Sequence, residues 1–171
     1  MKFDFYNEIA EGYDELYREE QFRKYSLVSN FFGERILDIG CGTGLLLQYL
    51  LSLKNISVYV GIDISKNLIN IARKKFKNIK FAKFILSDAT TFDYLSLNLE
   101  FDTIVSFTAL HNMQNIDFLK NLPYAKCYIF SLLIKSERFN MIEKIILRNF
   151  VILKEICDLH DKILICRKEI R

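Results

Sequence analysis

The sequence has few of the residues that cross-link small proteins or bind metals. Its 171 residues include four cysteines and only two histidines. The cysteines, Cys41, Cys127, Cys157 and Cys166, form no C-x-x-C pair, and two histidines are too few for a common zinc pattern. We therefore expect buried free thiols and no metal site.

Long apolar runs are also missing. The N-terminal stretch MKFDFYNEIAEGYDELYREE alternates charges where a signal peptide needs an uninterrupted apolar core. No apolar run elsewhere reaches the length that crosses a membrane. These absences predict a cytoplasmic protein that does not insert into a membrane.

Proline occurs once, and no repeat, low-complexity tract or Pro/Gly/Ser-rich linker divides the chain. Hydrophobic residues make up 51% and charged residues 26%, as in ordinary globular proteins. The length suits one compact domain with a sizeable core. We predict a single domain over residues 1–171, with 1–33 as an N-terminal helical cap and 34–171 as the core.

The charge balance gives little support for a nucleic-acid partner. The net charge is +3, and cationic and acidic residues are interspersed. RKKFKNIKFAK, residues 73–83, is a local exception. It is interpreted as the solvated end of a helix, where cations favour the helix dipole, with an anionic partner as the alternative.

Apolar runs of strand length alternate with helical patterns, which is typical of βαβ units and a parallel sheet. The expected strands are ERILDIG, SVYVGID, KFAKFILSD, FDTIVSFTAL and KCYIFSLLI. Helices are expected over 45–53, 63–76, 115–122 and 137–150, and Ser65 is the expected N-cap of the second of them. A loop with a short turn is expected over 91–100. VILKEICDLHDKILICRKEI predicts an antiparallel hairpin joined at His160-Asp161.

The pattern thus predicts an α/β fold with a seven-stranded, mostly parallel sheet and a C-terminal antiparallel hairpin. Helices should cover both faces. Ahead of the first strand, apolar residues at three- and four-residue steps predict two further helices, in DFYNEIAEGYDELY and EEQFRKYSLVSNFF.

The stretch RILDIGCGTG, residues 35–44, ends the first strand in an acid and three glycines spaced by one residue. Such glycines allow a sharp turn and bring bare backbone N–H groups against a ligand at the start of a helix. A dinucleotide fingerprint requires G-x-G-x-x-G, but Gly44 arrives one residue early and position 45 is Leu. A nicotinamide or flavin is disfavoured, and the absence of G-K-[ST] disfavours a nucleoside triphosphate.

This loop resembles the D-x-G-x-G-x-G motif of class I S-adenosylmethionine-dependent methyltransferases, which lies under the methionine end of the cofactor. Asp38, Gly40, Gly42 and Gly44 match the motif position by position. The resemblance implies a Rossmann-like three-layer sandwich, S-adenosyl-L-methionine as cofactor and S-adenosyl-L-homocysteine as product. FYNEIAEGYDELY is similar to the N-terminal Y-D-x-x-Y stretch of many such enzymes.

The resemblance also assigns residues after the second and third strands. Asp63 would accept hydrogen bonds from both ribose hydroxyls, for which a carboxylate is suited, or else would cap the helix beginning near Ser65. Ile64 would offer an apolar face to the adenine ring. Asp88, followed by Ala89, would accept from the adenine amino group, or else is a turn residue.

After the fourth strand, SFTALHNM resembles the stretch that lies under the transferable methyl group. Phe107 should lie near the cofactor. His111 is the candidate general base, since its reference pKa lies near neutrality, with packing or a structural hydrogen bond as the alternative. Tyr13, and with less support Tyr6, would close over the cofactor or pack there.

The methyl acceptor is the least constrained part. Enzymes that methylate exocyclic amines of nucleobases usually carry [ND]-P-P-[YF] after the fourth strand, and this sequence has SFTALHNM there. No long insertion follows the fourth or fifth strand to form a substrate lid. The primary hypothesis is a methyltransferase acting on a small molecule. The alternatives are an RNA or protein methyltransferase, or a methyltransferase-like subunit completed by a partner protein.

Overall fold

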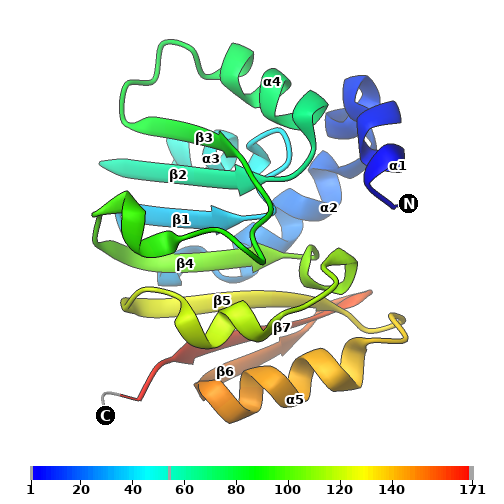
Figure 1. The fold of residues 1–171 in the computed structure, drawn as a ribbon, viewed down its shortest axis with the longest axis vertical. Helices are drawn as coiled ribbons and strands as arrows, with labels where there is room; N and C mark the ends of the chain where they lie inside the picture. The colour runs from blue at the N-terminus through cyan, green and yellow to red at the C-terminus, as the bar shows by residue number, and fades with distance from the viewer. Residues whose placement is uncertain (1, 54, 170–171) are drawn as a thin grey trace.

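The computed structural model describes residues 2–53 and 55–169, which form a central sheet with helices on both faces (Figure 1). The strand order is β3-β2-β1-β4-β5-β7-β6. The strands are β1 (Arg35–Ile39), β2 (Val58–Asp63), β3 (Ala82–Leu86), β4 (Phe101–Phe107), β5 (Ala125–Leu133), β6 (Val151–Cys157) and β7 (Asp161–Arg167).

The predicted mixture of parallel and antiparallel strands is confirmed. Strands β1 to β5 pair in parallel, with Leu37 opposite Val60 on one side and Ile104 on the other. Strand β7 lies antiparallel to both β5 and β6, with Ile129 opposite Ile165. The hairpin therefore inserts its second strand beside the parallel sheet, and its first strand, β6, forms the edge.

Five α-helices and five short 3-10 turns precede or connect the strands of the described chain. The helices are α1 (Lys2–Glu8), α2 (Tyr13–Leu27), α3 (Leu45–Leu51), α4 (Lys66–Lys75) and α5 (Phe139–Asn149). The 3-10 turns are η1 (Ala10–Gly12), η2 (Ser29–Phe31), η3 (Tyr94–Leu97), η4 (Leu110–Asn112) and η5 (Asp117–Asn121).

Two apolar clusters hold the layers together. One packs β-strand residues against α2, α3 and α4, with Tyr25, Leu46 and Ile69 at its centre. The other packs the opposite face against η3, η5 and α5. Figure 1 shows α3 behind the sheet and α5 in front of its lower part. Because helices and turns cover both faces of the sheet, the sequences of β1 and β2 are nearly continuous apolar runs.

Local sequence signals predicted most helix starts correctly. Ser65 caps α4, where the Leu68 N–H donates to Ser65 Oγ at 3.3 Å. The segment over 115–122 differs from the predicted helix, because it contains only the five-residue turn η5. Asn115 Oδ1 starts this turn by accepting from the Asp117 N–H at 2.7 Å. Pro123 ends it by keeping Leu122 extended, with ψ of 144°.

The N-terminal helices divide differently from the sequence prediction. Helix α1 ends at Glu8, a single 3-10 turn follows, and α2 begins at Tyr13 directly after Gly12. Glycine disfavours helix, which explains a break at this point. Helix α2 then runs without interruption through the boundary expected near residue 18. Its Tyr13 end lies at the glycine loop, so the helix can cover a site there.

The thiol prediction holds for two of the four cysteines. Cys41 and Cys166 are buried, Cys127 is half-buried and Cys157 is exposed. The prediction of a buried thiol is wrong for Cys157 because this residue ends the edge strand β6, where no further strand covers it.

Two searches of the described residues gave negative results. No helix within 2–53 or 55–169 is long and apolar enough to cross a membrane. The same residues contain no group of three or more His, Cys, Asp and Glu side chains placed to hold a metal ion.

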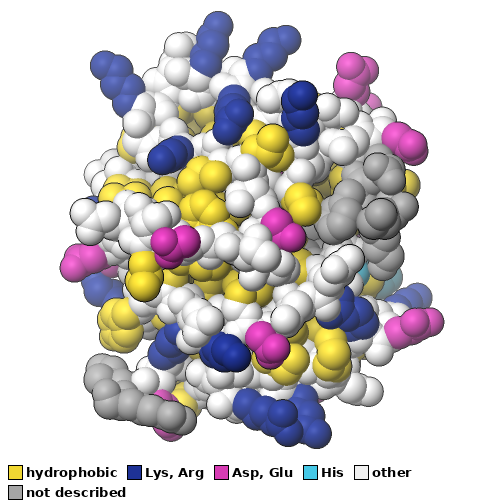
Figure 2. Space-filling view, viewed as in Figure 1, with side chains coloured by type: hydrophobic (Ala, Val, Ile, Leu, Met, Phe, Trp, Pro, Cys, Tyr) yellow, Lys and Arg dark blue, Asp and Glu magenta, His cyan; other side chains and the backbone are white. Residues whose placement is uncertain are grey.

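The basic stretch over 73–83 is the solvated end of α4, as predicted. Arg73, Lys74 and Lys75 form the last turn of the helix and are exposed. Figure 2 shows lysine and arginine side chains along the upper edge of the molecule, in the region of α4 in Figure 1. The segment leads into the amino end of β3, and near its start Phe76 packs beside Gly44 of the glycine loop.

Candidate active site

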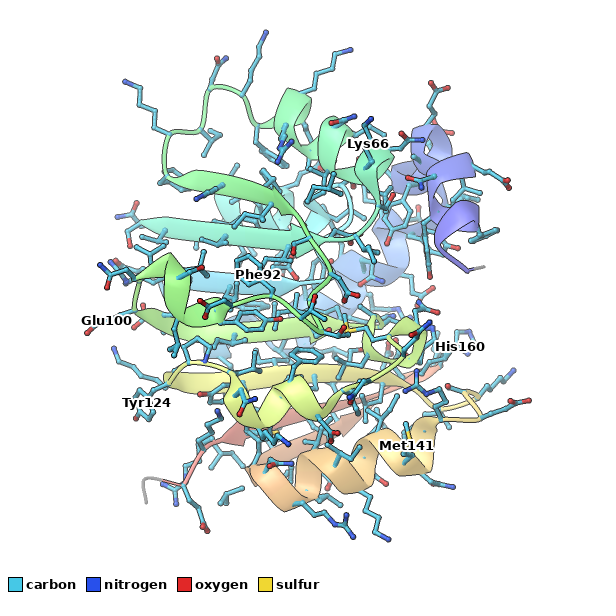
Figure 3. The ribbon with its side chains drawn as sticks, viewed as in Figure 1. Lys66, Phe92, Glu100, Tyr124, Met141 and His160 are labelled. Carbon is cyan, nitrogen blue, oxygen red and sulfur yellow. The ribbon has the colours of Figure 1, made fainter. Side chains whose placement is uncertain are left out.

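A cavity of about 370 Å³ opens at the carboxyl ends of β1 to β5. In an open α/β sheet this edge is where ligands bind. Figure 3 marks the edge by Lys66, which begins α4, and His160, in the β6–β7 turn, whereas Glu100 and Tyr124 lie at the opposite end. The lining that the sequence predicted comprises Tyr13, Gly40, Asp63, Ile64, Asp88, Ala89, Phe107 and His111.

The glycine loop adopts backbone angles that favour glycine. Gly40, Gly42 and Gly44 have φ of +78°, +54° and +78°. A Cβ on Gly40 would collide with that of Ala109, and one on Gly42 would lie 3.4 Å from the Tyr13 ring. Gly40 lines the cavity, whereas Gly42 and Gly44 shape the turn without lining it.

Asp63 ends β2 and faces the cavity while holding the glycine loop. Its Oδ2 accepts from the Gly42 N–H at 2.9 Å, and its Oδ1 accepts from the Ser65 N–H at 2.8 Å. Burial raises the pKa of Asp63 above its usual value, and these hydrogen bonds oppose the rise. Asp63 thus lies in the cavity and bonds to the start of α4, and its contact with a ribose stays a prediction. Ile64, beside it, also lines the cavity.

Asp38 lies behind the glycine loop and outside the cavity lining. It is buried, and its Oδ2 accepts a hydrogen bond from Tyr59 Oη at 2.5 Å. Burial raises the pKa of Asp38 to about 7, although the bond from Tyr59 lowers it. The observed contact joins β1 to β2, and direct contact of Asp38 with a cofactor stays a prediction.

Asp38→Asn should change how stability depends on pH. Because the folded pKa of about 7 exceeds the unfolded value, the folded chain binds an extra proton between about pH 4 and 7. The free energy of unfolding of the wild type should therefore fall, relative to Asp38→Asn, by about 2 kcal/mol from pH 5 to 7. Urea unfolding at several pH values measures this difference.

The control for that measurement is Asp102→Asn. A hydrogen bond from Lys126 lowers the pKa of Asp102, so this carboxylate stays ionised throughout the window. The wild type should show no fall relative to this variant between pH 5 and 7. Parallel curves for wild type and Asp38→Asn would contradict the raised pKa of Asp38.

Asp88 and Ala89 form the third wall of the cavity, after β3. Asp88 Oδ1 accepts from both the backbone N–H and the Oγ1 of Thr90, each at 2.8 Å. Both bonds go to one carboxylate oxygen. Asp88 is therefore a turn residue, as one interpretation expected, and also faces the cavity.

The residues that follow β4 form the wall of the cavity that, by the resemblance, would lie nearest the transferred methyl group. Phe107, Thr108 and His111 line the cavity here. Thr108 has a φ of +52°, which is rare for a β-branched residue. Arg138 supports the segment that follows, because its guanidinium donates to the backbone carbonyls of His111, Met113 and Gln114.

Helix α2 contributes a wall that sequence reasoning largely missed. Tyr13, Tyr17, Glu20 and Gln21 follow helical spacing along one face of the helix, and all four line the cavity. That spacing is the signal that could have identified Tyr17, Glu20 and Gln21. Asp14, next to Tyr13, fixes the helix to the glycine loop by accepting from Thr43 Oγ1.

Helix α1 closes the side of the cavity near the start of α4. Asn7 Oδ1 accepts from Ser65 Oγ at 2.8 Å, and Asn67 Nδ2 donates to the Asn7 carbonyl at 2.9 Å. Across the cavity, Asn112 Nδ2 donates to Tyr6 Oη at 3.0 Å. Burial raises the pKa of Tyr6 and of Tyr13, so both hydroxyls stay protonated near neutral pH.

Comparison with known families identifies the family to which the chain belongs. A family model described as "Methyltransferase domain" matches residues 36–124, more than half of the chain. An uncharacterized methyltransferase, C1347.09 of Schizosaccharomyces pombe, is 32% identical over 105 residues, which are 55% of this chain and 36% of the relative. The chain thus spans well under half of that relative's length.

Solved structures show the same fold at low identity. A SAM-dependent methyltransferase from Aquifex aeolicus has a TM-score of 0.72 and 15% identity over 94% of this chain and 97% of the other. A putative methyltransferase of Haloferax volcanii, in complex with the Trm112 methyltransferase activator, has a TM-score of 0.74 and 12% identity, covering 95% and 97%. The chain belongs to the methyltransferase-domain family, within the class I S-adenosylmethionine-dependent methyltransferase superfamily.

Proposed function

We propose that the protein transfers a methyl group from S-adenosyl-L-methionine to a small molecule. The observation that carries the proposal is the cavity in which Asp63, Asp88 and the glycine loop meet at the carboxyl ends of the strands. These groups match what the cofactor offers. Carboxylates accept from ribose hydroxyls and from an adenine amino group, and Gly40 contributes to the cavity lining where the methionine end would lie.

When bound, the cofactor supplies a methyl group on a positively charged sulfur. In-line transfer from such a centre depends mainly on positioning and exclusion of water. In this proposal Asp63 and Asp88 orient the nucleoside, and Ile64 packs on the adenine ring. Tyr13 and Tyr6 shield the cavity from solvent, and Phe107 lies beneath the methyl group.

His111 is the proposed proton acceptor for acceptors that must lose a proton. It lines the cavity at the exit of β4, and Arg138 holds its backbone carbonyl at 3.2 Å. Backbone support of this kind fixes where the imidazole enters the cavity. A neutral imidazole can then take a proton from a bound hydroxyl or amine.

A small acceptor is favoured by the coverage of the site. Helices α1 and α2 both contribute to a cavity of about 370 Å³, which suits a small molecule better than a folded macromolecule. Within the basic stretch over 73–83, Lys75 pairs with Asp14 and Phe76 packs beside Gly44. These internal contacts give part of the stretch a structural role, which weakens the RNA alternative. The four free cysteines are compatible with the proposed cytoplasmic location.

A partner protein is the second proposal, favoured by one observation. The Haloferax volcanii protein of the same fold is paired with an activator. The present chain matches 97% of that protein's length. A comparable partner would complete the site without changing the cofactor residues.

Calorimetric titration of the purified chain with S-adenosyl-L-methionine and S-adenosyl-L-homocysteine tests the function. We expect saturable one-to-one binding of both, and no binding of NAD or ATP as controls. Absence of binding by a folded chain would contradict cofactor use by the isolated protein. Binding restored only by a co-purified protein would support the partner proposal.

A further inference from the structure

The end of the cavity farthest from Asp63 and Asp88 is built from α2 and the exits of β4 and β5. Glu20, Gln21, Thr108 and Leu133 line it, beside His111. If the proposed function holds, the cofactor fills the other end, and this one receives the methyl acceptor. Its chemistry therefore indicates which acceptors can enter.

The described lining residues carry negative charge and no lysine or arginine. Glu20, Asp63 and Asp88 are its carboxylates. An anionic acceptor would lose its hydration without gaining an ionic partner, which is costly in a partly buried site. An amine or ammonium would meet a carboxylate instead.

Lys24 lies next to this end but has no donor left for an anion. Its side chain is 1% exposed, and Nζ is within 2.6 Å of Glu20 Oε1 and 2.8 Å of Thr108 Oγ1. It also forms an ion pair with the buried Asp161. An ammonium has three donors, and these three contacts use them. Two carboxylates share one cation, so the cluster keeps a net negative charge.

Gln21 provides a second, independent indication. Its side chain lines the cavity but is only 7% exposed. Its Oε1 is buried without a hydrogen-bond partner among the described residues. A buried acceptor without a partner destabilises the site, and a ligand that brings an N–H donor to this oxygen removes the cost.

We propose that the methyl acceptor is a primary or secondary amine, bound through its nitrogen by the side chains of Glu20 and Gln21. This inference rests on the proposed function. The amine binds as an ammonium and gives one proton to the His111 imidazole. The neutral nitrogen then forms the new N–C bond with its lone pair while the C–S bond breaks and its electrons stay on sulfur. The nitrogen thereby becomes a methylammonium, which pairs with the Glu20 carboxylate until release.

The test compares amines and carboxylates of matched shape. The chain is saturated with S-adenosyl-L-homocysteine, and binding is measured by calorimetry and ligand-observed NMR. The pairs are butylamine with butyrate, 2-phenylethylamine with 3-phenylpropionate, and tryptamine with indole-3-propionate. We expect at least one amine to bind at least tenfold more tightly than its matched carboxylate.

Substitutions connect this preference to the two side chains. Glu20→Gln keeps an oxygen for Lys24 but removes the charge, and should reduce the amine preference to within threefold. Gln21→Leu should weaken amine binding about fivefold. Glu19→Gln is the matched control, since it makes the same change at the exposed neighbouring position and should leave the preference intact.

Each failure has a distinct meaning. If S-adenosyl-L-homocysteine itself does not bind, the proposed function fails and this inference fails with it. If the product binds but every amine binds no better than its carboxylate, or not at all, the amine assignment is overturned alone. The amine assignment would likewise be overturned if Glu20→Gln kept the preference for amines over carboxylates and Gln21→Leu bound amines as tightly as wild type.

Discussion

Replacing Asp63 with alanine should weaken binding of S-adenosyl-L-methionine by about 100-fold or more. The proposed role of Asp63 is to accept hydrogen bonds from the ribose hydroxyls, and bonds to a charged group contribute about 1.5–3 kcal/mol each. The same carboxylate holds the Gly42 and Ser65 N–H groups. Its loss therefore removes a ligand contact and loosens the glycine loop together.

Asp63→Asn separates these two contributions only in part. The asparagine amide has one oxygen, so it can accept a hydrogen bond from the N–H of either Gly42 or Ser65. Its NH₂ group would then face the other N–H, and two donors cannot bond to each other. We expect its cofactor affinity to fall nearly as far as that of Asp63→Ala. Titration calorimetry with cofactor and product measures both variants, with circular dichroism to establish that they remain folded.

Asp93→Ala is the matched control for a lost turn bond. Asp93 accepts from the Leu95 N–H at 3.1 Å, two residues ahead, just as Asp63 does with Ser65. It lies outside the cavity lining. Cofactor affinity should stay within threefold of wild type in this variant. A folded Asp63→Ala protein that binds equally well would remove the ribose assignment.

The sheet and the glycine loop were predictable because their signals are local. Apolar runs, Ser65 and the spaced glycines each report on their own neighbourhood. Parallel strands bring their carboxyl ends to one edge, so strand ends alone place Asp63, Asp88 and Phe107 at a common cavity. These signals predicted the seven strands and the antiparallel hairpin at the end of the chain, which the structure confirms, but not the order of the strands in the sheet.

Contacts between distant segments account for what the sequence did not reveal. Thr108 lies 84 residues from Lys24, and no local pattern indicates that their side chains meet. Asp38 shows that a motif match, too, does not reveal which side chain a residue contacts. It matches a ligand-binding motif by position, yet its carboxylate bonds to Tyr59 on the neighbouring strand. The amount of space around each motif residue depends on packing that composition and spacing do not encode.

Lys24→Met should destabilise the protein by about 3–5 kcal/mol, because it leaves a buried charge without its partner. Lys24 and Asp161 are both 0% exposed, and Asp161 Oδ1 has no hydrogen-bond partner among the described residues. With the lysine gone, Thr108 Oγ1, at 3.1 Å from Asp161 Oδ2, would be the nearest remaining donor. A single neutral hydroxyl cannot replace an ammonium.

The double variant Lys24→Met, Asp161→Leu tests whether the loss comes from the stranded carboxylate. Removing both charges replaces the ion pair with apolar packing, which is often neutral or stabilising in proteins. The double variant should therefore regain at least half of the free energy of unfolding that Lys24→Met loses. Urea denaturation of the two variants and of Asp161→Leu completes the thermodynamic cycle.

Lys162→Met provides the comparison at a more exposed site. Lys162 also bridges two carboxylates, those of Glu143 and Glu155, each at 2.8 Å, but its side chain is 21% exposed. Because water can solvate the carboxylates that remain, the expected loss is under about 1 kcal/mol. Equal losses for Lys24→Met and Lys162→Met, or additive effects in the double variant, would show that burial of Asp161 does not determine stability. If instead Lys24→Met loses much stability and the double variant regains it, the protein tolerates a costly buried ion pair next to its cavity. That pair is bonded to Thr108, a lining residue with positive φ.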